Sequence, residues 1–318
     1  MNVKIGIPRG MFYYDYHILW EEFFKNLGVE VIISPKTNKD ILNHGISTCV
    51  DEACLPVKVF HGHVNYLKDK VDYIFIPKIM SIYKREYGCP KHLGLPDMVK
   101  HSISDLPEII APVVNLKSSK RGLKDAVVYS GKYFTNNKRE ILKAYEMACV
   151  KHEEQSLSNI LDENIDFKKY NSRKILLLGH PYNIYDNYIN MEVGKKLESN
   201  DIKIINTEMI QESIAREYAN TLSKRMFWTQ GQRIIGVAFN LIENSEIDGI
   251  IYISAFGCGL DSVLIELVDR KAREYNTPFT LLTIDEQTGE AGINTRIEAF
   301  LDMLKWRDEN EDNISAFR

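Results

Sequence analysis

The stretch Gly249-Ile-Ile-Tyr-Ile-Ser-Ala-Phe-Gly-Cys-Gly-Leu260 decides how this chain folds. Its apolar part, residues 249–255, predicts a buried strand, and residues 261–275 predict an amphipathic helix. The expected apolar face of that helix consists of Val263, Leu264, Leu267 and Val268. Cys258 is therefore expected between a strand C-terminus and a helix N-terminus, where open α/β sheets bind ligands and where a thiolate is favoured. On this stretch alone, Cys258 is a ligand, a nucleophile or a packed small residue.

The same alternation of strand and helix runs through the rest of the chain. A strand at 3–8 and a helix at 13–27 open one series, and the strand that starts at Lys174 opens a second. This alternation predicts an α/β fold of two Rossmann-like, doubly wound domains with a site in the cleft between them. The predicted segments are an N-terminal domain at 1–125, a helical linker at 126–173, a C-terminal domain at 174–306 and a polar tail at 307–318.

Two local predictions concern cysteines that we interpret as packing residues. Residues 46–50 are expected to form a strand that contains Cys49, and residues 132–154 one long helix that contains Cys149. Free cysteine commonly behaves as a small buried apolar residue. A third long helical region is expected over 211–244.

Composition excludes several classes of protein. The 318 residues are 44% hydrophobic and 26% charged, with a net charge of −4, which gives no electrostatic basis for binding nucleic acid or an anionic membrane. The N-terminus enters a strand without the pattern of a signal peptide, and no apolar run approaches the ~18 residues of a membrane helix. We therefore expect a cytoplasmic protein. Five cysteines, an odd number, argue against a disulfide framework.

Three cysteines share one local pattern. Cys54 lies two residues before Pro56, Cys89 directly precedes Pro90, and Cys258 precedes the helix described above. Proline is favoured in the first turn of a helix, and each of the three cysteines is expected where a strand has just ended or a helix is about to begin. Their wide spacing excludes the zinc ribbon, thioredoxin and ferredoxin motifs, which need Cys-x-x-Cys. Spacing alone leaves open whether they are three converging ligands or three separate thiols.

Longer motifs carry a family resemblance. They are Ile5-Gly-Ile-Pro-Arg-Gly10, Asp51-Glu-Ala-Cys-Leu-Pro-Val-Lys58, Phe60-His-Gly-His63, Tyr87-Gly-Cys-Pro90, Phe256-Gly-Cys-Gly259 and Asp285-Glu-Gln-Thr-Gly-Glu-Ala-Gly-Ile-Asn-Thr-Arg-Ile-Glu-Ala-Phe300. With these motifs the chain resembles the acyl-CoA dehydratase activase-related proteins. Those proteins are similar to the iron–sulfur subunits of 2-hydroxyacyl-CoA dehydratases and benzoyl-CoA reductases.

The resemblance implies one 4Fe–4S cluster in the cleft between two Rossmann-like domains. By matching motif, Cys54, Cys89 and Cys258 would be its ligands, and one iron would stay open for a small-molecule substrate. The implied partner is a separate ATP-dependent iron–sulfur activator that donates low-potential electrons, and the implied protein is oxygen-sensitive. The relatives contain two related subunits, which is compatible with a homodimer. No motif in the chain indicates ATP hydrolysis or CoA binding.

Two alternatives accompany this reading. The chain could be a non-catalytic module that carries the cluster for electron transfer or for interaction with a dehydratase-like complex. It could instead be a structural zinc protein, in which His92 completes a Cys3His site. A nucleophilic role for Cys258 ranks low, because the sequence shows no base that must lie beside it.

Other residues are weaker candidates for a pocket or for support of the ligands. Histidines two residues apart on a helix do not face each other, so His61 and His63 are expected to be structural or to support a ligand. Phe227 and Trp228 are expected in the core or at an interface. The remaining candidates are Arg9 as an anion or sulfur donor, Tyr182 and Asn183 as pocket residues, Gly257 and Gly259 as the room around Cys258, and Glu286 and Glu290 in proton transfer or helix capping.

Overall fold

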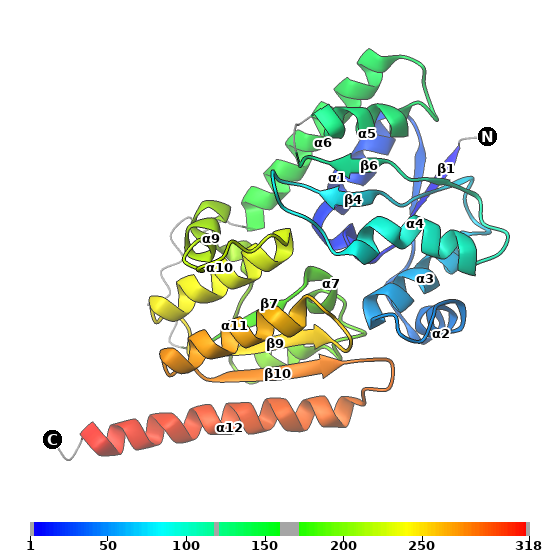
Figure 1. Cartoon of the computed structure of the whole chain (residues 1–318). Coiled ribbons are helices and arrows are strands. Elements are labelled where there is room, and N and C mark those ends of the chain that lie inside the picture. The colour runs from blue at the N-terminus through cyan, green and yellow to red at the C-terminus, as the bar shows by residue number, and fades with distance from the viewer. Residues whose placement is uncertain (1–2, 118–120, 160–171, 316–318) are drawn as a thin grey trace. The chain divides into compact units, whose positions relative to one another are not determined.

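The computed structural model describes the backbone of residues 3–117, 121–159 and 172–315. The chain divides into two compact units (Figure 1). Unit 1 comprises Met1–Leu161 and Arg225–Gln232, and unit 2 comprises Asp162–Lys224 and Arg233–Arg318. Each unit contains a four-stranded parallel sheet with helices between the strands, which confirms the predicted α/β class.

The sheet of unit 1 has the strand order β2-β1-β3-β5. Its members are β1 (Lys4–Ile7), β2 (Glu30–Ile33), β3 (Tyr73–Phe75) and β5 (Glu108–Ile110), and all neighbours pair in parallel. A separate parallel pair joins β4 (Lys78–Ser81) to β6 (Val113–Asn115). The order reverses between β1 and β3, which makes the carboxyl ends of these strands the expected crevice of the unit.

The helices of unit 1 start largely where the sequence indicates. They are α1 (Tyr13–Asn26), α2 (Lys39–Thr48), α3 (Leu55–Leu67), α4 (Pro90–Ser102), α5 (Arg121–Gly131) and α6 (Lys138–Asn159). The predicted strand at 46–50 is wrong, because α2 continues to Thr48 and Cys49 caps its C-terminus. The side chain of Asn38 fixes the start of α2 by accepting the backbone N–H groups of Asp40 and Ile41.

Two glycines allow α2 and α3 to pack backbone against backbone. A Cβ added at Gly45 would lie 2.0 Å from the Lys58 carbonyl oxygen, and one at Gly62 would lie 1.9 Å from the Ile41 carbonyl oxygen. Real Cβ atoms do not approach an oxygen that closely, so both positions require glycine. Gly62 separates the two histidines of the His61-Gly62-His63 motif, and this packing gives the motif a structural role.

The predicted single helix at 132–154 is also different in the structure. Helix α5 ends at Gly131, and α6 begins at Lys138 and runs to Asn159. Ile141, Ala144 and Ala148 of α6 are buried in the core that also contains Phe23 and Phe24 of α1. Both helices fall largely within the range 126–173 that the sequence suggests as a linker. Residues 160–171 of that range lie outside the described residues.

The sheet of unit 2 has the strand order β10-β9-β7-β8. Its members are β7 (Lys174–Gly179), β8 (Lys203–Ile205), β9 (Gly249–Ala255) and β10 (Phe279–Ile284), all in parallel register. All seven residues of β9 are buried, as a strand covered on both faces should be. The order reverses between β7 and β9, so the crevice of this unit lies at their carboxyl ends.

The helices of unit 2 differ more from the sequence-based prediction. They are α7 (Pro181–Ile184), α8 (Val193–Glu198), α9 (Glu212–Ala219), α10 (Thr229–Glu243), α11 (Asp261–Glu274) and α12 (Glu290–Ser315). The helical region at 211–244 is two helices, and residues 225–232 belong to unit 1. Helix α11 matches its prediction to within one residue, although Val263 is 43% exposed and not on the buried face.

Helix α12 is longer than the sequence indicates. It lies along β10 in unit 2 (Figure 1) and continues to Ser315, into the range predicted as a polar tail. Its Phe300 ring occupies the space beside Gly249, where an added Cβ would come within 2.7 Å of the ring. The glycine that opens β9 therefore accommodates an aromatic residue of α12.

No helix among the described residues is both long enough and apolar enough to span a membrane.

Candidate functional site

Cys258 lies in a tight turn, three residues after β9 and three residues before α11. Its N–H donates to the Ala255 carbonyl at 3.1 Å, and its own carbonyl accepts the N–H of Ser262 at 3.2 Å. Gly257 has φ +72°, a left-handed conformation that favours glycine. At both Gly257 and Gly259, an added Cβ would meet nothing within 4 Å. The predicted placement of Cys258 is confirmed, and the turn around it is uncrowded.

A histidine that the sequence did not single out lies beside Cys258. His180 directly follows β7, the strand that pairs with β9, and it caps the N-terminus of α7. A ring nitrogen of His180, the sulfur of Cys258 and a carboxylate oxygen of Asp261 all lie within 4.8 Å of one another. We call these three residues the Cys258 triad. The sequence showed no base that must lie beside Cys258, and the structure places a histidine there.

Asp261 is held in place by two hydroxyl groups of β9. The Tyr252 hydroxyl donates to Asp261 Oδ1 at 2.8 Å, and the Ser254 hydroxyl donates to Asp261 Oδ2 at 2.8 Å. Because Tyr252 and Ser254 are two residues apart on a strand, they project from the same face. His180 Nε2 lies 3.2 Å from Asp261 Oδ1, within ion-pair distance although not aligned as a regular hydrogen bond. All four side chains are buried.

Burial and the contact between the two groups have opposite effects on the pKa values of His180 and Asp261. Burial alone disfavours a charged imidazole, but the attraction of Asp261 and the contacts with Asp261 and Cys258 outweigh it, so the pKa of His180 lies well above its ordinary value. Burial likewise raises the pKa of Asp261, yet His180 and the two hydroxyl groups reverse this effect and lower it. Both shifts favour an ion pair of His180 and Asp261 beside Cys258.

The donor set of the triad could in principle bind a metal ion by itself. However, the Asp261 oxygens already accept two hydroxyl groups and face the imidazole. A metal ion bound by Asp261 and His180 would have to replace their direct contact. We therefore describe the triad as an ion pair, with its carboxylate held by two hydroxyl groups of β9, next to a thiol.

Cys54 and Cys89 have the helix-start positions that the sequence predicts. Each is the N-cap residue of its helix, α3 for Cys54 and α4 for Cys89, with a proline in the first turn. Neither side chain forms a capping hydrogen bond with its helix. Both belong to unit 1, whereas Cys258 belongs to unit 2. All five cysteines are described, and none forms a disulfide.

The loop before Cys89 is held by a distant part of the chain. The Tyr87 N–H donates to the Phe227 carbonyl at 2.8 Å, and the Thr229 N–H donates to the Tyr87 carbonyl at 3.1 Å. The carboxylate of Glu86, which is buried, lies 3.0 Å from the guanidinium of Arg225. Residues 225–229 thus fix the loop by backbone pairing and an ion pair. The Phe227 side chain itself is 48% exposed and is not in the core.

The other two cysteines have surroundings consistent with packing. Both are partly buried, and burial raises the pKa of the Cys49 thiol and of the Cys149 thiol. Cys149 also interacts with the hydroxyl of Tyr145 one turn earlier on α6. Thiols whose ionised form is disfavoured are poor metal ligands and poor nucleophiles.

Arg9 is held where the sequence places it, directly after β1. Its backbone N–H donates to the Ser34 hydroxyl at 2.8 Å, its Nε–H donates to the Ser34 carbonyl at 3.1 Å, and its guanidinium lies 5.0 Å from the centre of the Tyr13 ring.

Tyr182 and Asn183 lie next to the triad in sequence and are both buried. The Tyr182 ring stacks on the His180 ring at 5.0 Å. The amide of Asn183 has no hydrogen-bond partner for its oxygen or nitrogen within the described part of the chain. A buried amide without partners is costly, so a polar ligand at this position would be stabilised.

Glu286 and Glu290, the two acidic candidates for proton transfer or helix capping, have different surroundings. Glu290 lies in the first turn of α12, is largely exposed and pairs with Lys196 at 2.8 Å, which fits helix-dipole complementarity. Glu286 is partly buried in the turn between β10 and α12.

His92, the candidate fourth zinc ligand, is buried against the edge of the Phe12 ring at 4.3 Å. Within the described residues, no group of three mutually close ligand atoms includes His92.

His61 and His63 are buried on α3 and are bonded within the protein. His61 Nδ1 contacts the Val57 carbonyl at 2.9 Å, and His63 Nε2 contacts the Thr37 hydroxyl at 3.0 Å. Burial, and then the positive charge of Arg9, lower the pKa of His63 to about 3.

This shift predicts that unit 1 loses stability in mild acid. In the unfolded chain His63 is protonated below about pH 6.5, but in the folded chain it stays neutral down to about pH 3. Protons therefore favour the unfolded state between these values, and the contribution of His63 is complete above pH 6.5 and lost as the pH falls. Between pH 7 and pH 5 the free energy of unfolding should fall by about 2 kcal/mol more in the wild type than in His63→Gln. Urea unfolding at both pH values tests this, and equal pH slopes would contradict it.

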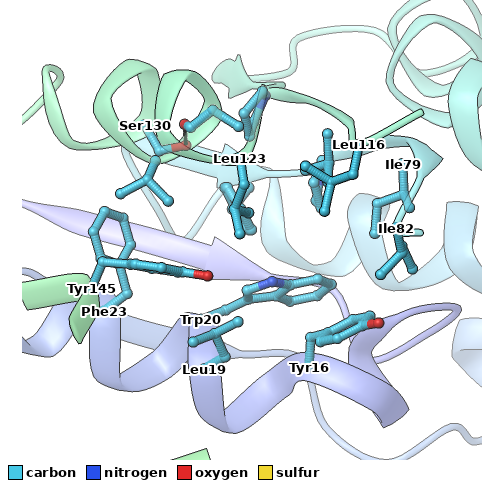
Figure 2. A pocket seen from close by; sticks show the side chains of 16 residues that line it. Tyr16, Leu19, Trp20, Phe23, Ile79, Ile82, Leu116, Leu123, Ser130 and Tyr145 are labelled. Atoms are coloured by element: carbon cyan, nitrogen blue, oxygen red, sulfur yellow. Dashed lines mark hydrogen bonds between the residues drawn. The ribbon is translucent and has the colours of Figure 1, made fainter. Parts of the chain in front are cut away.

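A separate cavity of about 170 Å³ lies within unit 1. Figure 2 shows Tyr16, Trp20 and Phe23 of α1 on one side and Leu123 and Ser130 of α5 on the other. The described residues that line it include no histidine, cysteine or carboxylate, and the Ser130 hydroxyl donates to the Ala126 carbonyl at 2.9 Å. The described lining is mainly apolar, with polar groups from Tyr16, Ser130 and Tyr145, and it includes no typical metal ligand.

The fold and these positions define an α/β protein of parallel sheets that presents cysteines at helix N-termini and beside a buried histidine–aspartate pair. Residues 4–210 match the family described as CoA enzyme activase uncharacterised domain (DUF2229). Residues 117–304 match the family described as 2-hydroxyglutaryl-CoA dehydratase, D-component. Each match covers more than half of the 318 residues, so the chain belongs to these families and is an activase-related, dehydratase-like protein.

Comparisons with individual proteins add little. The comparison with curated proteins gave no match. Among solved structures, ZnuA is 7% identical and the laminin-binding protein Lmb of Streptococcus agalactiae 8% identical. Both alignments cover 96% of this chain, with 99% of ZnuA and 100% of Lmb, at a TM-score of 0.29. TM-scores this low support neither a common fold nor a common function.

Proposed function

We propose that this chain is the cluster-bearing component of a dehydratase-like reductive system. It would hold one 4Fe–4S cluster through Cys54, Cys89 and Cys258 and accept low-potential electrons from an ATP-dependent activator. The observation that carries the proposal is the shared placement of the three cysteines at or just before helix N-termini. Membership of the dehydratase D-component family, which is associated with iron–sulfur clusters, supports the choice of metal.

The residues present suit such a group. Cys54 and Cys89 lie at the positive ends of two 13-residue helices, α3 and α4, which favour thiolate over thiol. The open space at Gly257 and Gly259 leaves room for a bulky group on the Cys258 sulfur. The buried ring of His180 lies beside that sulfur. When bound, a 4Fe–4S cluster supplies one-electron reduction at low potential.

The chain's own residues would then bind and orient a substrate beside Cys258. The buried amide of Asn183 can donate and accept hydrogen bonds. The aromatic ring of Tyr182 stacks on His180 and can pack against an apolar part of the substrate. Glu286 is the better of the two acidic candidates for holding or moving a proton, because it is partly buried whereas Glu290 is largely exposed. The proposed substrate is a small molecule with a polar group that can reach Asn183.

Purification without oxygen tests the proposed cofactor. We expect a brown protein with about four iron and four sulfide per chain, which gives an electron paramagnetic resonance signal after reduction. A colourless protein with stoichiometric zinc and no sulfide would refute the proposal. Turnover with the activator, ATP and a reductant then separates an enzyme from a non-catalytic carrier of electrons, because only an enzyme consumes substrate under these conditions.

A further inference from the structure

We propose that the cavity between α1 and α5 of unit 1 is a binding site for a small neutral aromatic molecule with one hydroxyl group, a ligand of the phenol class. The site goes beyond the proposed function, because Cys54, Cys89 and Cys258 are not among the described residues that line it. The size, charge, shape and polar groups of the cavity each restrict what it can hold.

The size of the cavity limits the ligand to about one ring. Its volume is about 170 Å³. An apolar cavity of about 150 Å³ in a protein interior holds a molecule of benzene, whereas pockets for drug-sized ligands begin at about 300 Å³. A single six-membered ring with a small substituent therefore fits, and a nucleotide or coenzyme A does not.

The described lining carries no charge. It includes no lysine, arginine, histidine, aspartate or glutamate. An ion that moved there from water would lose its hydration without gaining a counter-ion, which is strongly unfavourable. Carboxylates, phosphates and ammonium groups are therefore disfavoured as ligands. A phenol is neutral at physiological pH, because its hydroxyl group ionises only near about pH 10.

Aromatic side chains form one wall of the cavity, and aliphatic side chains form the other. Figure 2 shows the indole of Trp20 across the cavity from Leu116 and Leu123. The Trp20 ring is held by an edge-to-face contact with the Phe75 ring, with the two centres 5.4 Å apart. A flat aromatic ring can stack on the indole and pack against the leucines with its other face. These walls favour an aromatic ligand over an aliphatic one of the same size.

The polar groups of the lining suit one hydroxyl group. The indole N–H of Trp20, which can only donate, has no hydrogen-bond partner among the described residues. The Ser130 hydroxyl donates to the Ala126 carbonyl at 2.9 Å, so its oxygen remains an acceptor. Figure 2 shows the Tyr145 hydroxyl directed toward the indole. A phenolic hydroxyl can accept from the indole N–H and donate to one of these two oxygen atoms.

The test follows the indole N–H signals of the full-length protein labelled with nitrogen-15 tryptophan. The chain has three tryptophans, Trp20, Trp228 and Trp306, and Trp20→Phe identifies the signal of Trp20. We expect phenol to shift this signal saturably, with a Kd on the order of 0.1–1 mM, and to leave the other two signals in place. A Trp20 signal that does not respond to phenol, or equal shifts of all three signals, would overturn the site.

Two further probes test the class of ligand. Cyclohexanol keeps the hydroxyl group but has no aromatic face, so it should bind about fivefold more weakly than phenol. The benzylammonium ion keeps the aromatic ring but carries a charge, so we expect no binding. Equal affinities for phenol and cyclohexanol would refute the aromatic class, and binding of benzylammonium as tight as that of phenol would refute the neutral one.

Ala126→Leu tests the location, because Ala126 lines the cavity from α5 and a longer side chain would occupy the space of the ligand. We expect the Kd of phenol to rise about tenfold or more, whereas Ala291→Leu, at an exposed position of α12, should leave it unchanged. An unchanged Kd in an Ala126→Leu protein that circular dichroism shows to be folded would refute the location.

Trp20→Phe decides the question if Ala126→Leu does not fold. Measured by calorimetry, Trp20→Phe should weaken phenol binding about fivefold and benzene binding less, because only phenol loses a hydrogen bond. Equal losses for phenol and benzene would refute the role of the indole N–H, and unchanged binding of both would refute the site.

Discussion

Cys258→Ala should abolish or alter the iron–sulfur cluster, whereas Cys149→Ala should leave it intact. Cys258 is in an open turn beside the buried ring of His180, so replacing it removes one proposed ligand. Cys149 lies on α6, and burial disfavours its ionised form. The measurement is iron and sulfide per chain after purification without oxygen, together with the visible absorption of the protein.

The other ligands provide the matched comparison. Cys54→Ala and Cys89→Ala should behave like Cys258→Ala, because the proposed centre takes one thiolate from each. If Cys149→Ala loses the cluster as Cys258→Ala does, the ligand assignment is wrong. Melting temperatures measured without metal distinguish the loss of a ligand from the loss of the fold.

Asp261→Ala should be the most destabilising substitution near the site. Asp261 is 0% exposed and is the acceptor for the Tyr252 and Ser254 hydroxyl groups and the counter-ion of His180. Removing one partner of a buried ion pair typically costs about 3–5 kcal/mol. We expect that loss in the free energy of unfolding of unit 2, measured by urea unfolding followed by circular dichroism.

Asp269, on the same helix, provides the control. It forms an ion pair with Arg273 one turn later, whose side chain is 77% exposed, so Asp269→Ala should cost less than about 1 kcal/mol. Asp261→Asn keeps two oxygen or nitrogen sites and should fall between the two alanine variants. If Asp261→Ala were no more destabilising than Asp269→Ala, the buried network would not have the importance that we assign to it.

The sequence alone was sufficient to predict the strand β9, the helix α11 and the position of Cys258 between them. A parallel strand buried on both faces gives a continuous apolar run, and the helix after it is long and periodic, so local patterns determine both. The starts of α3 and α4, at Cys54 and Cys89, could also be predicted, because a proline in the first turn marks each helix.

The sequence alone was not sufficient to predict that His180 and Asp261 lie together. They meet only because β7 pairs with β9 in a register that places Gly179 opposite Ile253. No local pattern encodes that pairing, although Tyr252 and Ser254, two polar groups on one face of an apolar strand, were a usable signal. The misassigned strand at 46–50 has a related cause. Gly45 suggests a break in a helix, but here it allows a close approach to α3 that depends on tertiary packing.

The pairing of the Cys89 loop with residues 225–229 has a consequence for the order of events during synthesis. Until Thr229 has left the ribosome, Tyr87 lacks its two backbone partners and Glu86 lacks Arg225. The strands and helices of residues 1–161 can form earlier, but the segment that presents Cys89 cannot reach its final conformation. A nascent chain therefore completes the first unit only after more than two thirds of the protein has been translated, and any fragment that ends before Arg225 should have a disturbed Cys89 loop.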